Sequence, residues 1–232
     1  HGTCLSSGRG GAGRRAFAVA LVLVLVSWRY VDWLRGPPHF QDLSVYRAGA
    51  RALLDGSPLY ADRSAGHGQL VFTYPPFAAL IFVPFALLPW AGAAVALVLL
   101  SALAYAVLIG VFGRSLGWTR TGIAVAAGVG LLAEPVLRTI QQGQVNLVLA
   151  ALVSADLLIV PRRYRGILIG IAAGIKLVPA AFGLCLLARR DLGSILRLIA
   201  TTVGTVWPSL LAPSWRHRSR GRTTGSGASR SA

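Results

Sequence analysis

Hydrophobic residues along this chain form long runs that are separated by short polar or charged connections. Six of these runs are long and apolar enough to enter a bilayer, which a helix of roughly 20 apolar residues can cross. They cover residues 16–34, 91–112, 121–137, 145–160, 166–188 and 192–212. The pattern therefore predicts an all-α protein, built as a polytopic transmembrane helix bundle.

A seventh apolar run, residues 77–88, is too short to join this set. It lies between Pro75-Pro76 and Pro89. As a helix it would extend only about 18 Å, against a hydrocarbon core of about 30 Å. We expect this run to lie on the outer interface of the membrane or to dip into it.

Arginines between the runs give the expected orientation, since short cytoplasmic loops are enriched in Lys and Arg. Arg14 and Arg15 place the start of the first span in the cytoplasm, so residues 35–76 form an outer loop. The arginines at 114, 120, 162, 163 and 165 are then cytoplasmic, and residues 141–146 lie outside. The charges predict a multi-pass protein of the plasma membrane.

Residues 166–188 allow two interpretations. A single span would place Arg189 and Arg190 outside, whereas two short helices that meet near Lys176 and Pro179 would keep these arginines in the cytoplasm. Each arm would be about half a bilayer in length, which is tolerable only inside a helix bundle. The charge pattern favours the re-entrant pair.

The outer loop carries the first candidate for chemistry. Asp42 precedes residues 43–54, whose apolar positions 43, 46, 50, 53 and 54 have helical spacing, while Arg47 and Arg51 share another face. We expect an amphipathic helix at the membrane surface. Asp42 could cap this helix, or it could act as a general base where a lipid-linked donor meets a hydroxyl acceptor. The two roles are compatible.

Two cations are candidates for binding a phosphate. Arg138 ends a predicted span, and Glu134 four residues earlier offers it an internal ion pair as the alternative. Lys176 is the only lysine among 23 Lys and Arg residues and lies in an apolar segment. It could extend its amine to the interface as a structural residue, or it could face a phosphate.

Several polar residues near the predicted outer side complete the candidate site. Gln141, Gln144 and Asn146 could cap the next helix or hydrogen-bond a sugar. Tyr74 precedes a rigid Pro-Pro turn, where an aromatic ring can lie at the level of the lipid headgroups. Asp156 lies one turn before Pro161 at the predicted cytoplasmic end, and we expect it to pair with nearby arginines.

Composition supports a membrane protein and argues against other classes. Hydrophobic residues make up 55% of the chain, mean hydropathy is +0.64, and 13% of residues are charged, against about 25% in soluble domains. The net charge of +16 does not indicate nucleic-acid binding, because the arginines are spread over connections and the tail. Cys4 and Cys185 form no metal or disulfide pattern, and no nucleotide-binding motif occurs, so neither a metal nor a cofactor is expected.

The two ends of the chain differ from the middle. The chain begins at His1, contains no methionine, and changes after residue 212 to a Ser-, Gly- and Arg-rich tail. We therefore expect a disordered segment at residues 1–15, a transmembrane domain at 16–212, and a disordered basic tail at 213–232. The tail is interpreted as frame-shifted or truncated, and the chain as a fragment.

Five short motifs occur in order between residues 16 and 200. They are DLSVYRAG at 42–49, LDGSPLY at 54–60, FTYPPF at 72–77, GQVN at 143–146 and GIAAGIKLVP at 170–179. In this ordered set the chain resembles glycosyltransferase family 87, the actinobacterial mannosyltransferases that depend on polyprenol-phosphate-mannose. The family was formerly a domain of unknown function.

The resemblance implies a GT-C-type fold with its active site on the extracytoplasmic side of a bacterial plasma membrane. It implies inverting transfer of mannose from a polyprenyl-phosphate sugar to a glycolipid or lipoglycan acceptor, with Asp42 as the catalytic base. Arg138, Lys176 and Tyr74 would then bind the donor phosphate, and the polar residues at 141, 144 and 146 would bind the acceptor sugar. Family members are about twice as long, so the resemblance also implies a truncated domain that is inactive alone.

Two other functions compete with this interpretation. A transporter or flippase-like protein would also place polar residues and a re-entrant segment within its spans, but its two halves should be similar, and no such repeat is found. A non-catalytic assembly or scaffold subunit is the third possibility. The transporter interpretation also gives no function to the polar outer loop around Asp42.

Overall fold

The computed structural model describes residues 39–60 and 71–210, and within them every regular element is a helix. The all-α prediction is confirmed for these residues, whereas the predictions for residues 1–34 and 211–232 lie outside them. The elements are α2 (Gln41–Leu54), α3 (Pro76–Ile81), α4 (Val83–Leu87), α5 (Trp90–Ser115), α6 (Arg120–Gly130), α7 (Glu134–Gln142), α8 (Asn146–Leu158), α9 (Ile167–Ile175), η1 (Val178–Phe182), α10 (Gly183–Ala188) and α11 (Leu192–Leu210).

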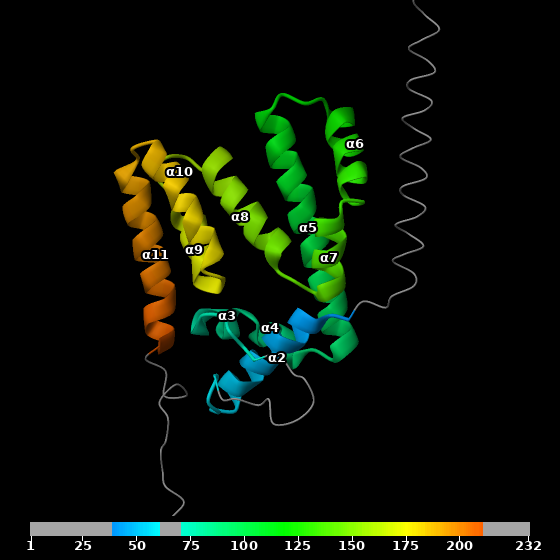
Figure 1. Ribbon diagram of the computed structural model, residues 1–232, viewed down its shortest axis with the longest axis vertical. Helices are drawn as coiled ribbons and strands as arrows, with labels where there is room; N and C mark the ends of the chain where they lie inside the picture. Colours follow the sequence, from blue (N-terminus) through cyan, green and yellow to red (C-terminus); the bar gives the residue numbers. More distant parts are fainter. Residues whose placement is uncertain (1–38, 61–70, 211–232) are drawn as a thin grey trace, which may run out of the picture.

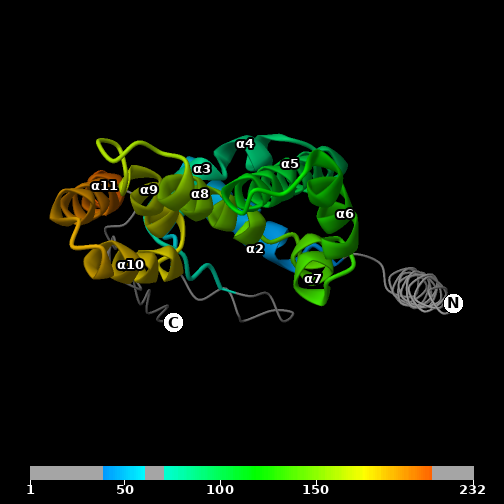
Figure 2. The same cartoon turned by 90° about the horizontal axis from the view of Figure 1, so that it is seen from above.

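The helices form a bundle that is closed at one end by a crossing layer. α5, α8, α9 and α11 run along the long direction of the molecule, and α2, α3 and α4 lie across their lower ends (Figure 1). Seen from above, α11, α9, α8 and α5 form a row, with α10 and α7 on one side of it (Figure 2). We call the end covered by α2–α4 the α2–α4 end. Residues 77–88 form no single spanning helix: they fall in α3 and α4, two short helices at this end.

One described helix, α5, is long and apolar enough by itself to cross a membrane. Its bounds agree with the predicted run at 91–112. The run at 121–137, which was predicted as one span, is broken in the structure: α6 and α7 are long and apolar enough together, but they are bent by 62° as in a broken span or a re-entrant loop. Pro135 lies in the first turn of α7, where its ring would clash with a helix that continued from α6. The run at 145–160 becomes α8, a helix of 13 residues.

The chain reverses within residues 166–188, as the two-arm interpretation predicted. α9 ends at Lys176, whose backbone is extended (φ −145°, ψ 129°), and η1 and α10 lead back toward the end from which α9 started (Figure 1). Two contacts join the residues after α10 to the end of α8 and the connection that follows it: Arg162 Nε lies 3.2 Å from Asp191 Oδ2, and Arg189 Nη1 donates to the Leu157 carbonyl at 3.4 Å.

Small residues allow α9 and α11 to pack closely. A Cβ atom at Gly170 would lie 2.7 Å from Cβ of Thr201 and 2.9 Å from the carbonyl oxygen of Leu198. Gly166 and Gly174 face α11 in the same way, at Ser194 and Thr205. Small residues at every fourth position are the usual way in which membrane helices bring their backbones together.

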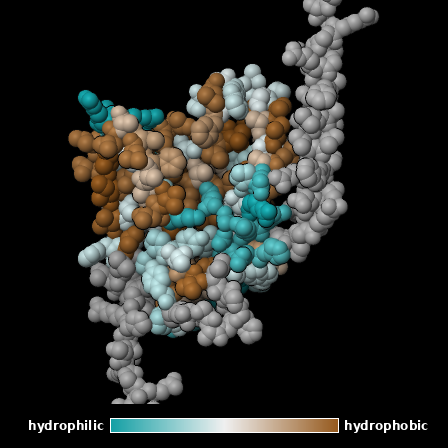
Figure 3. Space-filling view, in the orientation of Figure 1, coloured by the Kyte–Doolittle hydropathy of each residue, from teal (hydrophilic) through white to brown (hydrophobic). Residues whose placement is uncertain are grey.

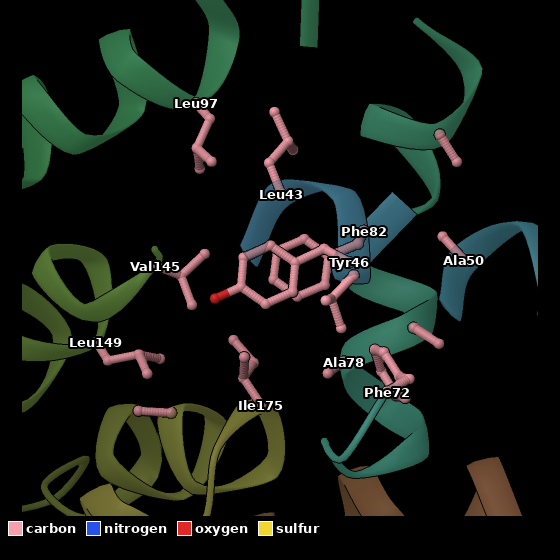
Figure 4. Packing of buried hydrophobic residues seen from close by; sticks show 14 of the residues in the cluster. Leu43, Tyr46, Ala50, Phe72, Ala78, Phe82, Leu97, Val145, Leu149 and Ile175 are labelled. Atoms are coloured by element: carbon pink, nitrogen blue, oxygen red, sulfur yellow. The ribbon is translucent and has the colours of Figure 1, made fainter. Parts of the chain in front are cut away.

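The core of the α2–α4 end is built around Tyr46. Its ring stacks on that of Phe82, with centroids 4.1 Å apart and an angle of 6° between the ring planes, and Figure 4 shows Leu43 and Val145 close to these rings. The predicted apolar face of α2 is confirmed in Leu43, Tyr46 and Ala50, which are fully buried. Burying a leucine side chain such as that of Leu43 stabilises the fold by about 1.5–3 kcal/mol.

Two charged residues do not lie where the sequence predicted. Arg47, expected on a surface face with Arg51, has an exposed fraction of only 5%. Asp156 was expected to pair with arginines, but its buried carboxylate accepts the backbone N–H groups of Gly166 (2.7 Å), Leu168 (2.7 Å) and Ile169 (3.2 Å). It satisfies the unpaired donors at the start of α9 instead.

Arginines gather at the opposite end of the bundle. The connections from α5 to α6, α8 to α9 and α10 to α11 all lie there (Figure 1), and these connections and the helix ends beside them carry Arg114, Arg120, Arg162, Arg163, Arg165, Arg189 and Arg190. On the face shown in Figure 3, apolar side chains cover much of the surface between the two ends, and hydrophilic groups gather around the lower part of α7 and the start of α2. We call this second end the arginine end.

Candidate active site

Asp42 lies in the first turn of α2, half-buried at the α2–α4 end. It is not the N-cap, because Phe40 occupies that position and no side chain caps the helix. The backbone N–H of Phe40 donates to the carbonyl of Gln141 at 3.0 Å, which ties the start of α2 to the end of α7. The positive end of the helix dipole stabilises the ionised carboxylate at this position.

Two tyrosines lie beside Asp42. The hydroxyl groups of Tyr46 and Tyr74 are 3.4 Å apart, and Tyr60 donates to the carbonyl of Tyr74 at 2.9 Å. Burial raises the pKa of Tyr46 far above its usual value, and the contact with Tyr74 and the negative charge of Asp42 raise it further. Burial and the charge of Asp42 also raise the pKa of Tyr74. Both hydroxyls therefore stay protonated at neutral pH and can donate hydrogen bonds.

Lys176 heads a chain of polar side chains on the other side of Tyr74. Its Nζ donates to Asn146 Oδ1 at 3.1 Å and lies 5.9 Å from the centroid of the Tyr74 ring. Asn146 donates to Gln144 Oε1 at 2.5 Å, and Gln144 donates to Gln142 Oε1 at 2.7 Å. The break in α9 places this amine where the first turn of α8 begins.

Most of the predicted site residues thus come together from segments far apart in the chain. Together with Tyr46, which was not predicted, they form what we call the polar cluster: Asp42, Tyr46, Tyr74, Gln144, Asn146 and Lys176. Gln141 contributes its backbone carbonyl next to this cluster. Arg138 faces Glu134 instead: its guanidinium, 64% exposed, lies 3.7 Å from the Glu134 carboxylate, 56% exposed.

An apolar groove of about 660 Å³ opens from the polar cluster and follows α8. Lys176 and Asn146 lie at one end of its lining and Arg189 contributes at the other. Its walls come from α5, α8, η1 and α10, and they include Leu149, Val153 and Phe182. Such a groove accepts a long apolar chain, with a cation near the start of that chain.

Sequence reasoning missed two members of this region, Tyr46 and Gln142. Tyr46 follows Asp42 by four residues in a helix, which is the spacing that places two side chains on the same face. That signal was available, but the sequence pattern assigned the aromatic ring to the apolar face. The contact of Gln142 with Gln144 depends on the left-handed turn at Gly143 (φ 68°), which the sequence pattern did not predict.

Comparison with known proteins defines the class of protein. Residues 72–220 match the model of glycosyltransferase family 87, so the chain belongs to that family. The resemblance drawn from the five motifs is confirmed. No solved structure gave a significant match.

Particular relatives refine this class. The chain is 40% identical over 221 residues to the polyprenol-phosphate-mannose-dependent α-(1-2)-phosphatidylinositol mannoside mannosyltransferase of Mycolicibacterium smegmatis, covering 84% of this chain and 50% of the relative. It is 37% identical to the enzyme of the same name from Mycobacterium tuberculosis, covering 88% and 53%. A phosphatidylinositol pentamannoside mannosyltransferase of M. smegmatis is 35% identical, covering 82% and 48%. The chain spans about half the length of these curated relatives.

Proposed function

We propose that this chain is the catalytic part of a membrane mannosyltransferase that takes mannose from a polyprenyl-phosphate carrier and adds it to a phosphatidylinositol mannoside or a related glycolipid. The observation that carries the proposal is the apolar groove ending at Lys176 and Asn146, in the region where Asp42 influences Tyr46 and Tyr74. The names of the relatives supply the sugar, the carrier and the class of acceptor.

In the proposed reaction Asp42 acts as general base. It takes the proton from an acceptor hydroxyl, whose oxygen forms a bond to the anomeric carbon of mannose. The bond from that carbon to the phosphate oxygen breaks, and its electron pair leaves with the polyprenyl phosphate. A single displacement of this kind inverts the configuration, and passes through an oxocarbenium-like state. The position of Asp42 supports the role, because it is half-buried and yet remains accessible.

Lys176 would bind the phosphate of the donor and stabilise the charge that develops on it as the bond breaks. Asn146 holds the amine in place, and Tyr74 supplies a hydroxyl that stays protonated. The polyprenyl chain would follow the apolar groove along α8. Arg138 is a second phosphate-binding candidate, although its exposed ion pair with Glu134 supports a local role.

Gln141, Gln144 and Asn146 would hydrogen-bond the sugar of the acceptor. Their amide groups combine donors and acceptors, which suits the hydroxyl groups of a mannoside. Gln144 and Asn146 already form a chain with Gln142, so a sugar hydroxyl that joins it would bind to side chains with fixed positions.

We further propose a multi-pass GT-C bundle with the α2–α4 end facing outside. The support is the separation of charge: the arginine-bearing connections lie together at the other end, as the positive-inside rule requires of the cytoplasmic side. The division into residues 1–15, a membrane domain at 16–212 with its outer loop at 35–76, and a basic tail at 213–232 remains part of this proposal. Since the relatives are about twice as long, we expect the 232 residues alone to bind donor but not to turn it over.

The test compares Asp42→Asn with Asp55→Asn in the protein at its natural length. Both acids lie on α2 or directly after it, and Asp55 is exposed at the far end. Asp42→Asn should lower the rate of mannose transfer by about 10²–10⁴-fold and leave donor binding unchanged, because the substitution keeps the shape of the side chain. Asp55→Asn should retain the full rate.

Other outcomes identify the other functions. A transporter or flippase-like protein would move lipid-linked sugar across vesicles equally well with or without the Asp42→Asn substitution, and a scaffold subunit would show no turnover in either form. Transfer that proceeds at the wild-type rate in Asp42→Asn would overturn the assignment of the base. A second variant tests the donor site separately from the base. Lys176→Gln should raise the KM for donor while the KM for acceptor stays constant.

A further inference from the structure

Arg47 is a buried cation that the proposed reaction does not use. Only 5% of its surface is exposed, and within the described part of the chain its Nη1 is buried with no hydrogen-bond partner. Burial, followed by the like charge of Arg51 one turn away, lowers the pKa of the guanidinium. A buried cation that no acid neutralises in the described residues, and whose Nη1 makes no hydrogen bond, is costly, and its retention is explained if an anion completes the site.

The guanidinium points at the start of the longest helix. Its central carbon lies 5.6 Å from the ring centroid of Trp90, which is the first residue of α5. Pro89 occupies the N-cap and no side chain caps this end. The first N–H groups of a helix and its dipole attract an anion. Arg47 and this helix end therefore adjoin one position that favours negative charge, and the charge of Arg51, one turn from Arg47, adds to it.

Apolar surface continues from this position along α5. Trp90 is 47% exposed, and Val95, Leu99 and Leu103 are exposed at intervals of four residues farther down the helix. Residues at this spacing lie on one face. A molecule with a phosphate at the start of α5 could thus lay an acyl chain along this face, as a glycerophospholipid in the outer leaflet would.

We propose that Arg47, Arg51 and the first turn of α5 form a second phosphate site, which binds the phosphodiester of the acceptor glycerophospholipid. This step rests on the proposed function, in which donor and acceptor both carry a phosphate. The two phosphates would bind to different cations. Lys176, which follows α9 and contacts Asn146, would bind the phosphate of the donor, whereas Arg47, which contacts Trp90 at the start of α5, would bind the phosphate of the acceptor. The acceptor would be anchored by its phosphate here while its sugar reaches Asp42.

The first experiment measures lipid binding and does not depend on transfer. The protein at its natural length is placed in phosphatidylcholine nanodiscs that contain a small share of phosphatidylinositol, and the retained lipid is measured by native mass spectrometry. Arg47→Gln should lower retention of phosphatidylinositol about tenfold or more. Arg114→Gln, which removes an exposed arginine at the opposite end of α5, should not. Equal retention in the two variants overturns the phosphate site.

A second measurement separates binding from folding. If Arg47 is there for an anion, Arg47→Met should leave the unliganded protein equally stable or more stable in an unfolding titration, because it removes an unpaired buried charge. If Arg47 is a structural residue, Arg47→Met should unfold more readily, and this result would overturn the proposal even where lipid retention is lost.

Kinetics then decide which lipid uses the site. Arg47→Gln should raise the KM for the phosphatidylinositol mannoside about tenfold or more, with the KM for donor unchanged, which is the reverse of Lys176→Gln. Loss of phosphatidylinositol retention with an unchanged acceptor KM would assign the site to bulk anionic lipid and overturn the role in acceptor binding. If no variant transfers mannose, the proposed function fails, and the retention experiment alone decides whether the phosphate site exists.

Discussion

The close approach of α9 to α11 leads to a prediction that compares two glycines. Gly170 on α9 faces α11, and an added Cβ atom would lie 2.7 Å from Thr201 and 2.9 Å from the Leu198 carbonyl. Gly204 lies within α11, with nothing within 4 Å of the same atom. We propose to replace each with alanine. Both changes add one methyl group to a helix, so they differ only in what that group meets.

The magnitude follows from two terms. Gly→Ala in a helix interior stabilises by about 1 kcal/mol, and this term is common to both variants. Overpacking a tight contact costs about 1–3 kcal/mol, and it applies to Gly170→Ala alone. Gly204→Ala should therefore raise the free energy of unfolding by about 1 kcal/mol. The free energy of unfolding of Gly170→Ala should be lower than that of Gly204→Ala by about 1–3 kcal/mol.

The assay is equilibrium unfolding in detergent micelles, followed by loss of helical circular dichroism as a denaturing detergent is added. The measurement compares the free energies of unfolding of the two variants. The gain from replacing glycine inside a helix is common to both, so it cancels from the difference. Gly170→Leu should widen the difference, since a larger side chain must displace Thr201 and the α11 backbone. If Gly170→Ala and Gly204→Ala unfold at the same midpoint, α9 and α11 do not pack as described, and the reasoning is refuted.

Three further predictions concern buried polar groups, and the same titration measures each. Asp156→Ala should lower the free energy of unfolding by about 1–3 kcal/mol, because three backbone donors lose their acceptor; the exposed Asp55→Ala is the control. The pKa of Asp191 is held below its usual value, mainly by hydrogen bonds from Ser194 and to a smaller extent by the charge of Arg162. Its stabilising effect is thus present at neutral pH and lost as pH falls below about 4, so Asp191→Asn should be less stable than wild type at pH 7 and match it in strong acid. Because burial raises the pKa of Tyr46, stability should fall as pH rises above about 10, and Tyr46→Phe should weaken that fall.

Local patterns in the sequence predicted much of the fold. The spacing of apolar residues found α2 and its buried face, and the length of the apolar run found α5. The break at Lys176 followed from the charge rule, because only a reversed chain keeps Arg189 and Arg190 with the other arginines. These features depend on periodicity, length or charge, which a single sequence displays directly.

Features that depend on tertiary contacts were not predictable in this way. The carboxylate of Asp156 accepts hydrogen bonds from backbone N–H groups 10 to 13 residues later, at the start of α9. The sequence predicted ion pairs instead, because several arginines lie nearby in the chain. The burial of Arg47 depends on where α5 begins in space. The bend between α6 and α7 coincides with Pro135, but a proline in an apolar run is also compatible with a continuous kinked helix.

The sequence singled out several residues of the candidate site but did not predict how they are arranged in space. Asp42, Tyr74 and Lys176 stood out because each is polar or cationic where the surrounding sequence is apolar. The contact of Lys176 with Asn146 joins residues 30 positions apart, and that of Tyr46 with Tyr74 joins residues 28 apart. Neither distance could be inferred from spacing.

Several apolar residues that line the groove along α8 are exposed, among them Leu158, Val178 and Phe182. In a bilayer these residues would face lipid, so a polyprenyl carrier could enter and leave sideways without passing through water. Its exchange would then be a diffusion in two dimensions, and the concentration that governs the reaction would be the mole fraction of carrier in the membrane. Adding inert phospholipid at a fixed total volume should slow transfer by surface dilution, whereas adding buffer should not.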